Sequence, residues 1–375
     1  MFSLLLSALF FGVTAGLVGA ATSLLIENIA CLNPILLLPA GVVAAGAWLM
    51  ISRRWSISVA SAITTGGPLP VVPTLIDATM QLLLVGLGAS LGREQAPRQV
   101  AAALSSRMDR VVIAGAAGGG LAAVYNVPLA GALYAFLLLP ITRTVRNFLV
   151  CALMAGVATL TSWLVLDVGT IYSVTESPIS TEDLGAYLFT ALMAMTLGLL
   201  LRELGSRSLR ATSSITLLSI PLACATVWIT ATYIPPVTGN GQLIVEQALL
   251  GLDPTYALIL IIAKLALTLA MLSSGARGGV LTPALALGAA GGAMTASLWN
   301  TSPVALALFG AFCALAISQQ SWIFAAIFVL ELSRPSLALS AVITLSALTV
   351  VTVGTFAKKR YARPPRSATP PDRSS

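Results

Sequence analysis

Apolar segments recur along almost the whole chain, and this pattern constrains the fold more than any other feature. Because 57% of the 375 residues are hydrophobic and only 9% are charged, a water-exposed surface of ordinary polarity cannot be built. In lipid the backbone must satisfy its own hydrogen bonds, which favours helices for long apolar segments. The sequence predicts an all-α polytopic membrane protein. The segments are residues 1–26, 35–51, 80–91, 111–140, 148–166, 186–201, 215–234, 255–272, 279–298, 303–317, 322–332 and 337–356.

Many of these segments are shorter than the roughly 20 residues that a straight spanning helix needs. We therefore expect tilted, broken or re-entrant helices beside full spans. The first segment lacks a preceding basic region and a following cleavage site, so it is predicted to be a retained helix. A transmembrane domain is expected over residues 1–357.

The charged residues predict the orientation of the chain. The net charge of +7 comes from basic clusters. We expect a protein of the plasma membrane, and the positive-inside rule places these clusters on its cytoplasmic side. Residues 167–183 hold four acidic residues and no lysine or arginine, so they should face outside. Residues 358–375 form a basic tail rich in proline and serine, expected to be disordered and cytoplasmic. A basic cluster beside a membrane helix indicates contact with anionic lipid, or the side of the membrane on which the segment lies, rather than nucleic-acid binding.

Residue types that are missing narrow the chemistry. The chain has no histidine, which excludes Ser-His and Cys-His catalytic pairs and histidine-ligated metals. Its four cysteines are scattered without paired spacing, so no disulfide framework, metal site or cofactor is indicated. A membrane enzyme would have to combine Lys264 with Ser273 or Ser274. On one helix these groups would be about 14 Å apart, which disfavours the enzyme.

Two halves of the chain echo one another. LGREQAP and RGGVLTP each place glycine and arginine before a proline-started helix, with Gly92 and Gly278 separated by 186 residues. The stretches that begin at Gly118 and Gly310 show a second echo at an offset of 192. Together they predict two structural repeats, approximately residues 8–168 and 186–357. In transporters such repeats often have inverted topology, with a substrate site where broken helices meet.

SSGARGGVLTPALALG, residues 273–288, is typical of a break followed by a new helix. Gly278 and Gly279 allow a sharp turn, and Pro283 suits the first turn of a helix. The amides of Val280 and Leu281 would then lack intrahelical partners and could bind an anion at the positive end of the helix dipole. A glycine motif for helix packing is the alternative interpretation.

LGREQAPRQ, residues 91–99, repeats the arrangement and adds a carboxylate. A charged Glu94 within the membrane should face a cavity or a partner. One interpretation is an ion pair with Arg93 or Arg98. The other places Glu94 beside anion-binding amides, where the ionised carboxylate competes with the anion and leaves when protonated. It would then be both a gate and a proton carrier.

Four ordered motifs resemble the CLC family of chloride channels and proton-coupled chloride antiporters. GREQAP resembles the family's GREGP, and SSGARGGVLTPALALG resembles SGxxGGxFxPxLxxG. VYNVPLAGALYA resembles FNxPLAGxLF, and GGPLP takes the place of GSGIP. The resemblance extends over approximately residues 8–362. It implies the CLC fold of tilted and broken helices in two inverted-topology repeats, and a homodimer with one anion pathway in each subunit.

The resemblance also implies roles for individual residues. Glu94 takes the position of the gating glutamate, and Tyr361 lies near the position of the pore tyrosine. The residues implied to bind the anion are Gly66, Gly67, Arg93, Glu94, Gln95, Val280, Leu281 and Tyr361. Gly67 replaces the selectivity serine, so preference among small anions does not follow from the motif.

One departure bears on proton coupling. Leu138 stands where antiporters of the family carry a second, inner glutamate, and leucine cannot relay protons. The resemblance therefore favours passive or weakly proton-coupled transport of chloride or a related small anion. The alternative is a proton-coupled antiporter that uses water or another acid, such as Glu203. Transport of a cation is disfavoured because helix N-termini repel cations.

Overall fold

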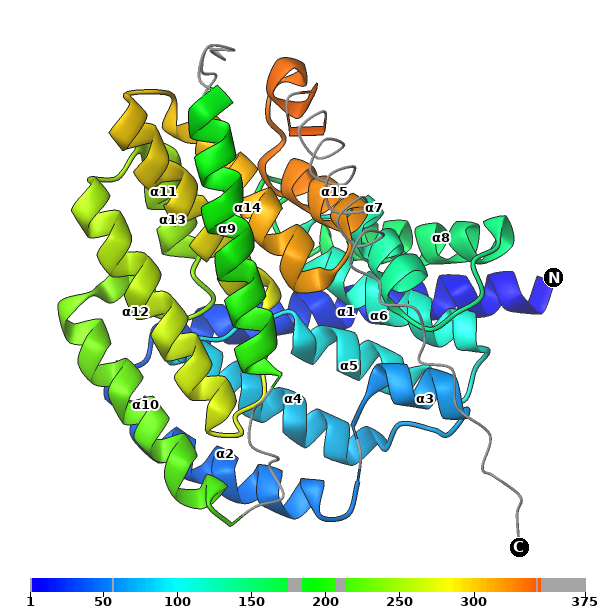
Figure 1. Ribbon diagram of the computed structural model, residues 1–375. Coiled ribbons are helices and arrows are strands. Elements are labelled where there is room, and N and C mark those ends of the chain that lie inside the picture. Colours follow the sequence, from blue (N-terminus) through cyan, green and yellow to red (C-terminus); the bar gives the residue numbers. More distant parts are fainter. Residues whose placement is uncertain (1, 56, 175–183, 207–213, 342, 345–375) are drawn as a thin grey trace, which may run out of the picture.

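The structure is a computed structural model that describes residues 2–55, 57–174, 184–206, 214–341 and 343–344 (Figure 1). Within these ranges the chain folds into helices and contains no strand. The helices of the first half are α1 (Phe2–Ala30), α2 (Leu37–Ser52), α3 (Val59–Thr65), α4 (Val71–Gly86), α5 (Gln95–Leu104), α6 (Arg110–Tyr125), α7 (Pro128–Leu133) and α8 (Val145–Ser162). Those of the second half are α9 (Leu184–Gly205), α10 (Thr216–Tyr233), α11 (Gln242–Leu250), α12 (Pro254–Ser273), α13 (Leu281–Trp299), α14 (Pro303–Gln319) and α15 (Trp322–Ser333).

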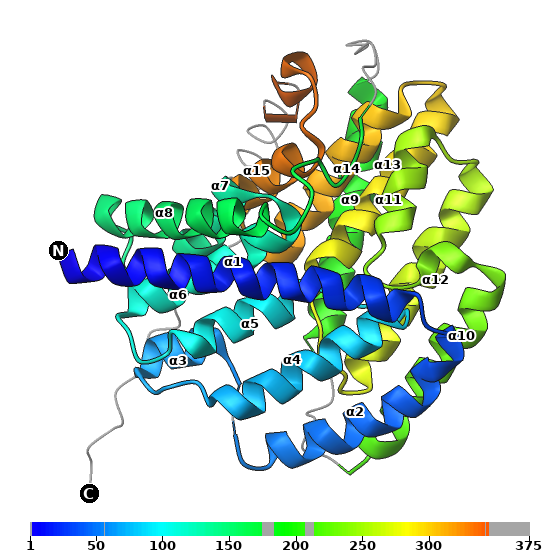
Figure 2. The same ribbon diagram turned by 180° about the vertical axis from the view of Figure 1, so that it is seen from behind.

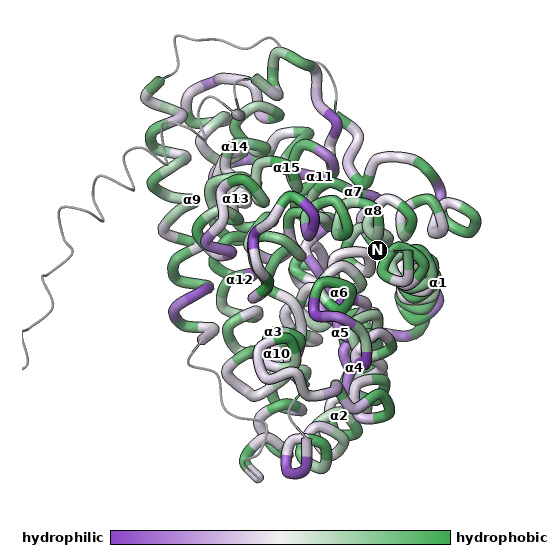
Figure 3. The backbone as a smooth tube through the Cα atoms, turned by 90° about the vertical axis from the view of Figure 1, so that its right-hand side faces the viewer, coloured by the Kyte–Doolittle hydropathy of each residue, from purple (hydrophilic) through white to green (hydrophobic). Residues whose placement is uncertain are grey.

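Full spans and shorter helices occur together, as the segment lengths predict. Among the described helices, seven spans are long and apolar enough to cross a membrane, while α4, α6, α14 and α15 are shorter. Figure 3 shows hydrophobic residues along most of the helical path, including the outlying α1. Large apolar side chains such as Phe10 and Leu188 are exposed on this surface, as contact with lipid requires.

The apolar segment 111–140 is not one helix, in contrast to its unbroken hydropathy. α6 ends at Tyr125, its C-cap Asn126 has a left-handed φ of 57°, and α7 begins at Pro128. Proline has no N–H to continue the preceding helix, so the chain restarts there. A π-helical turn, Tyr134–Leu138, follows α7.

The two halves pack in the same way. α1 contacts α6 as α9 contacts α14, α5 packs on α6 as α13 packs on α14, and α7 follows α6 as α15 follows α14. Between the halves, α2 lies against α10 and α7 against α15 (Figures 1 and 2). The repeated set of neighbours supports the two predicted structural repeats.

The register between the repeats differs by one residue from the sequence-based alignment. Gly92 pairs with Gly279 in an antiparallel bridge, while Gly278 packs against Leu91. Gly92 is therefore equivalent to Gly279 rather than to Gly278. Glu94 and Leu281, 187 residues apart, then occupy equivalent positions at the starts of α5 and α13.

Glycines bring α13 and α14 into backbone contact. Gly288 and Gly310 approach each other's carbonyl oxygens, and Gly292 lies against the carbonyl of Leu306. A Cβ at any of these three positions would overlap backbone atoms, which cannot rotate away. This contact fixes the long helix that carries Leu281.

We predict that Gly292→Ala lowers the thermal unfolding temperature of the purified protein in detergent. The added methyl group must push α13 and α14 apart, and overpacking of this kind costs about 1–3 kcal/mol. Gly156→Ala is the matched control, because this helical glycine has open space at its Cβ position. An unchanged unfolding temperature for Gly292→Ala would contradict the close packing.

Candidate functional site

Two loops meet at the centre of the molecule and place two helix starts side by side. The amide of Gly92 donates to the carbonyl of Gly279 at 2.7 Å, and the amide of Gly279 donates to the carbonyl of Gly92 at 2.9 Å. These loops lead into α5 and α13. The reciprocal pair therefore holds the N-termini of two helices from different repeats at one place.

Glu94 is the N-cap residue of α5, but its side chain does not cap that helix. Its carboxylate crosses to α13, where Oε1 accepts a hydrogen bond from the Leu281 amide at 2.8 Å. Oε2 accepts from the hydroxyl of Thr282 at 3.2 Å and from that of Tyr125 at 3.3 Å. Glu94 has no exposed surface. Three neutral donors and the positive end of the α13 dipole thus surround a buried carboxylate.

The glycines beside Glu94 provide the space that the carboxylate occupies. A Cβ at Gly92 or at Gly279 would overlap the carboxylate oxygens. Neither glycine has a positive φ, so steric room rather than backbone conformation is what these positions require.

The arginines of the motif contact aromatic rings instead of the Glu94 carboxylate. The guanidinium of Arg93 lies 5.1 Å from the ring centroid of Tyr125, and that of Arg98 lies 4.8 Å from the centroid of Tyr134. Arg98 Nε also donates to the backbone carbonyl of Glu94 at 2.8 Å. The only ion pairs among the described residues are Arg202–Glu203 and Arg277–Asp77. The ion pair considered for Glu94 with Arg93 or Arg98 is therefore absent here.

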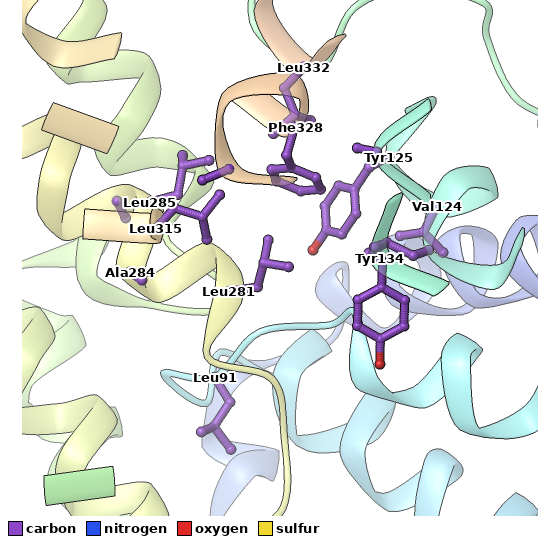
Figure 4. Packing of buried hydrophobic residues seen from close by; sticks show 14 of the residues in the cluster. Leu91, Val124, Tyr125, Tyr134, Leu281, Ala284, Leu285, Leu315, Phe328 and Leu332 are labelled. Carbon is purple, nitrogen blue, oxygen red and sulfur yellow. The ribbon is translucent and has the colours of Figure 1, made fainter. Parts of the chain in front are cut away.

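Apolar side chains enclose the site. Tyr125 packs edge-on against Phe328 with ring centroids 5.6 Å apart. Figure 4 shows the Tyr125 hydroxyl directed towards the start of α13, where Leu281 lies. In the same view Leu91 lies on the side of Leu281 that faces away from Tyr125. All of these side chains belong to the buried core, which excludes water from the carboxylate and strengthens its hydrogen bonds.

The structure brings some of the predicted anion-site residues together and places others elsewhere. Gln95 opens α5 and Val280 is the N-cap of α13, both half-buried beside Glu94 and Leu281 in sequence. Tyr361 lies outside the described residues, as does the predicted basic tail.

Gly66 is the C-cap of α3, and Gly67 lies in the short connection to α4, whose N-cap is Pro70. Gly66 has a φ of 73° and its amide donates to the carbonyl of Ala62, while the amide of Gly67 donates to the Thr65 hydroxyl. The nearest side chain to a Cβ at Gly66 would be Arg110, at the start of α6. The amides of both glycines are therefore used at the end of α3.

Thr282 and Tyr125 contact the carboxylate although the sequence alone did not single them out. Thr282 follows Leu281 and could have been inferred from the helix start. Tyr125 stands within the VYNVPLAG motif, 31 residues from Glu94, and only the packing of α6 on α5 brings it near.

The two residues considered for the inner proton route, Leu138 and Glu203, make contacts of other kinds. Leu138 packs half-buried against the apolar core. Glu203 is half-exposed and pairs with the adjacent Arg202 at 2.5 Å. Within the described part of the chain, no group of three or more acidic or cysteine side chains could hold a metal ion.

The contacts of Lys264 and Ser274 do not support the hypothesis of a Ser/Lys enzyme. Lys264 Nζ donates to the backbone carbonyls of Val237 at 3.0 Å and Gly239 at 2.6 Å. The Ser274 hydroxyl donates to the Met271 carbonyl at 2.7 Å. The lysine therefore braces a loop instead of activating a serine.

The protein combines apolar helices long enough to cross a membrane with a buried carboxylate that the N-terminus of another helix binds. This combination is typical of multi-pass membrane proteins of the transport class. Residues 56–354 match the family described as "Voltage gated chloride channel". The chain belongs to this family, whose members transport anions as channels or transporters and are not enzymes. It is 31% identical over 311 residues to the voltage-gated ClC-type chloride channel ClcB of Escherichia coli O157:H7 (strain EC4115 / EHEC), covering 76% of this chain and 73% of that protein.

Solved structures share the fold. A slow cyanobacterial Cl⁻/H⁺ antiporter matches with a TM-score of 0.72 and 19% identity, over 95% of this chain and 99% of that one. A CLC-type fluoride/proton antiporter matches with a TM-score of 0.67 and 16% identity, over 93% and 95% of the two chains. The predicted all-α fold of this family is confirmed.

We predict that Gly279→Ala expels the Glu94 carboxylate from the start of α13. The new methyl group would occupy the position of the carboxylate, and a flexible side chain yields more readily than the backbone. An experimental structure of the variant should show Glu94 beyond hydrogen-bond distance of the Leu281 amide. Gly278→Ala is the neighbouring control, since its methyl group would contact Leu91. Retention of the Glu94–Leu281 hydrogen bond in Gly279→Ala would contradict the prediction.

Proposed function

We propose that the protein moves chloride or a related small anion across the membrane along a pathway that Glu94 gates. The observation that carries this proposal is the hydrogen bond from the Leu281 amide to the Glu94 carboxylate at 2.8 Å. A carboxylate is itself an anion, so the donors that hold it can also hold a halide ion. The side chain and the transported anion would then compete for the same place.

Protonation gives this competition a switch. An ionised Glu94 is attracted by the α13 dipole and by the donors of Leu281 and Thr282. A protonated Glu94 loses most of that attraction, and the amide becomes free for a mobile anion. Flux should therefore increase as the pH falls.

We infer that transport is passive or only weakly coupled to protons. Leu138 has no titratable group and is packed among apolar side chains, so it cannot take the role of an inner proton acceptor. The alternative is a proton-coupled anion antiporter that uses water or another acid. The similar solved structures are described as Cl⁻/H⁺ and fluoride/proton antiporters, which keeps this alternative open to the experiment below.

We further expect a homodimer in the plasma membrane, with one pathway in each subunit and the tail from residue 358 in the cytoplasm. The apolar surface and the family membership support a membrane location. Mass photometry of the protein in lipid nanodiscs would measure the oligomeric state.

We predict that Glu94→Gln gives chloride flux in liposomes that no longer depends on pH. The neutral amide cannot ionise and so cannot be driven onto or off the Leu281 amide by protons. Wild-type flux should rise several-fold between neutral and acidic pH. Chloride efflux should be measured at several pH values for both proteins, with Glu27→Gln as a control for removal of an exposed carboxylate. A pH response in Glu94→Gln equal to that of the wild type would refute the gate.

The same liposomes test proton coupling. With a chloride gradient and a pH indicator inside, the passive interpretation predicts no uphill proton movement by the wild type. Proton movement driven by chloride, abolished in Glu94→Gln, would establish the antiporter instead.

A further inference from the structure

A second buried carboxylate lies outside the group around Glu94. Among the acidic residues that the structure describes, Asp77 and Glu94 are the two that are buried, and neither has exposed surface. Asp77 lies on α4. Its Oδ1 accepts from Arg277 at 2.9 Å, and its Oδ2 accepts from Gln81 at 2.8 Å. A carboxylate in this environment is stable only with such partners.

Arg277 belongs to the loop that leads into α13. Its guanidinium contacts the Asp77 carboxylate on α4 and also the Ser52 hydroxyl at the end of α2. Two residues further on, Gly279 pairs with Gly92, and the Leu281 amide that holds Glu94 follows. The Arg277 side chain therefore fastens the start of α13 to two helices of the other repeat.

The same helix also holds α5. Gln81 lies one turn after Asp77 on α4, and its amide nitrogen donates to the side chain of Gln99 on α5 at 3.0 Å as well as to Asp77. α4 thus contacts the helix that carries the gate and the loop that receives it. A shift of Asp77 would change the distance between Glu94 and its binding amide.

The equivalent connection in the other repeat is neutral. The loop before α5 is joined to α12 by Ser90 and Thr268, whose hydroxyl oxygens are 2.9 Å apart. Ser90 is equivalent to Arg277 by the register of Gly92 with Gly279. At these equivalent positions the side chain of Arg277 makes an ion pair, and that of Ser90 makes a neutral hydroxyl contact. The charge-assisted contact is the stronger of the two.

We propose that Asp77 is a positioning residue that acts through Arg277 to hold the N-terminus of α13 in its anion-binding geometry. This inference rests on the proposed function, because it takes the Leu281 amide as the place where the anion binds. Asp77 touches neither Glu94 nor the anion. Its effect is on the affinity of the site, through the loop from Arg277 to Leu281.

The test uses the purified full-length protein with Glu94→Ala as the background, so that chloride meets no competing carboxylate. Chloride affinity is measured by isothermal titration calorimetry, and unfolding temperature by differential scanning fluorimetry. Asp77→Asn should raise the chloride Kd on the order of tenfold, as loss of a ligand-orienting partner does at metal sites. The pair Asp77→Asn with Arg277→Gln should do the same without leaving either charge unpaired.

Ser90→Ala is the matched control, since it removes the equivalent neutral contact and leaves α13 fastened. Its chloride Kd should stay within twofold of the background. Arg277→Lys, which keeps the charge but loses the fork that reaches both Asp77 and Ser52, should give an intermediate Kd. This variant retains the counter-charge of Asp77 and supplies the test if the others fail to fold.

The outcomes separate this inference from the proposed function. If Glu94→Ala alone binds no chloride, the proposed function fails and the inference with it. If that background binds chloride and folded Asp77→Asn binds it equally well, only the positioning role is overturned. A rise in Kd with Ser90→Ala equal to that with Asp77→Asn would also overturn it, because the effect would then be general loosening.

Discussion

The structure depends on one constraint: a charged carboxylate buried within apolar helices must find donors that its own helix does not supply. Transfer of such an ion from water into a protein interior costs several kcal/mol unless hydrogen bonds compensate. Glu94 meets this requirement at the start of α13. There the Leu281 amide has no hydrogen-bond acceptor within its own helix, and it donates to Glu94, as does the Thr282 hydroxyl. Through Tyr125 and Leu281, the contact joins α5 to α6 and to α13.

The two repeats make the contact possible by presenting equivalent loops to one another. The bridge between Gly92 and Gly279 brings the start of α5 against the start of α13, and both glycines leave room for the carboxylate. At equivalent positions one repeat carries the acid, Glu94, and the other carries an apolar residue, Leu281, whose amide donates to that acid. The site thus combines a symmetric backbone with asymmetric side chains.

Short motifs were sufficient to predict the two helix starts, at Gln95 and at Leu281. Glycine followed by proline is enough to infer a helix start, and a lone acid in an apolar chain is enough to infer a special environment for Glu94. The partners supplied by packing were not predictable in the same way. Tyr125 reaches the carboxylate only because α6 packs on α5, and the pairing of Asp77 with Arg277 joins residues 200 positions apart.

The segment around Gly66 and Gly67 holds both a helix end and a helix start. The hydrogen bond from Gly66 to Ala62 terminates α3, and α4 begins at Val71. Glycine serves a helix end as readily as a helix start, so its presence does not give the direction of the dipole. The side on which the flanking helix forms depends on tertiary packing.

The backbone of Glu94 has a further consequence for how the protein moves. Its φ of −72° and ψ of −19° are already helical, so the movement in the proposed function would need rotation about side-chain bonds and no change in the backbone of Glu94. Such a movement would not require a membrane helix to tilt or slide. A gate of this kind requires no deformation of the bilayer, so changes in membrane thickness or tension do little work on it.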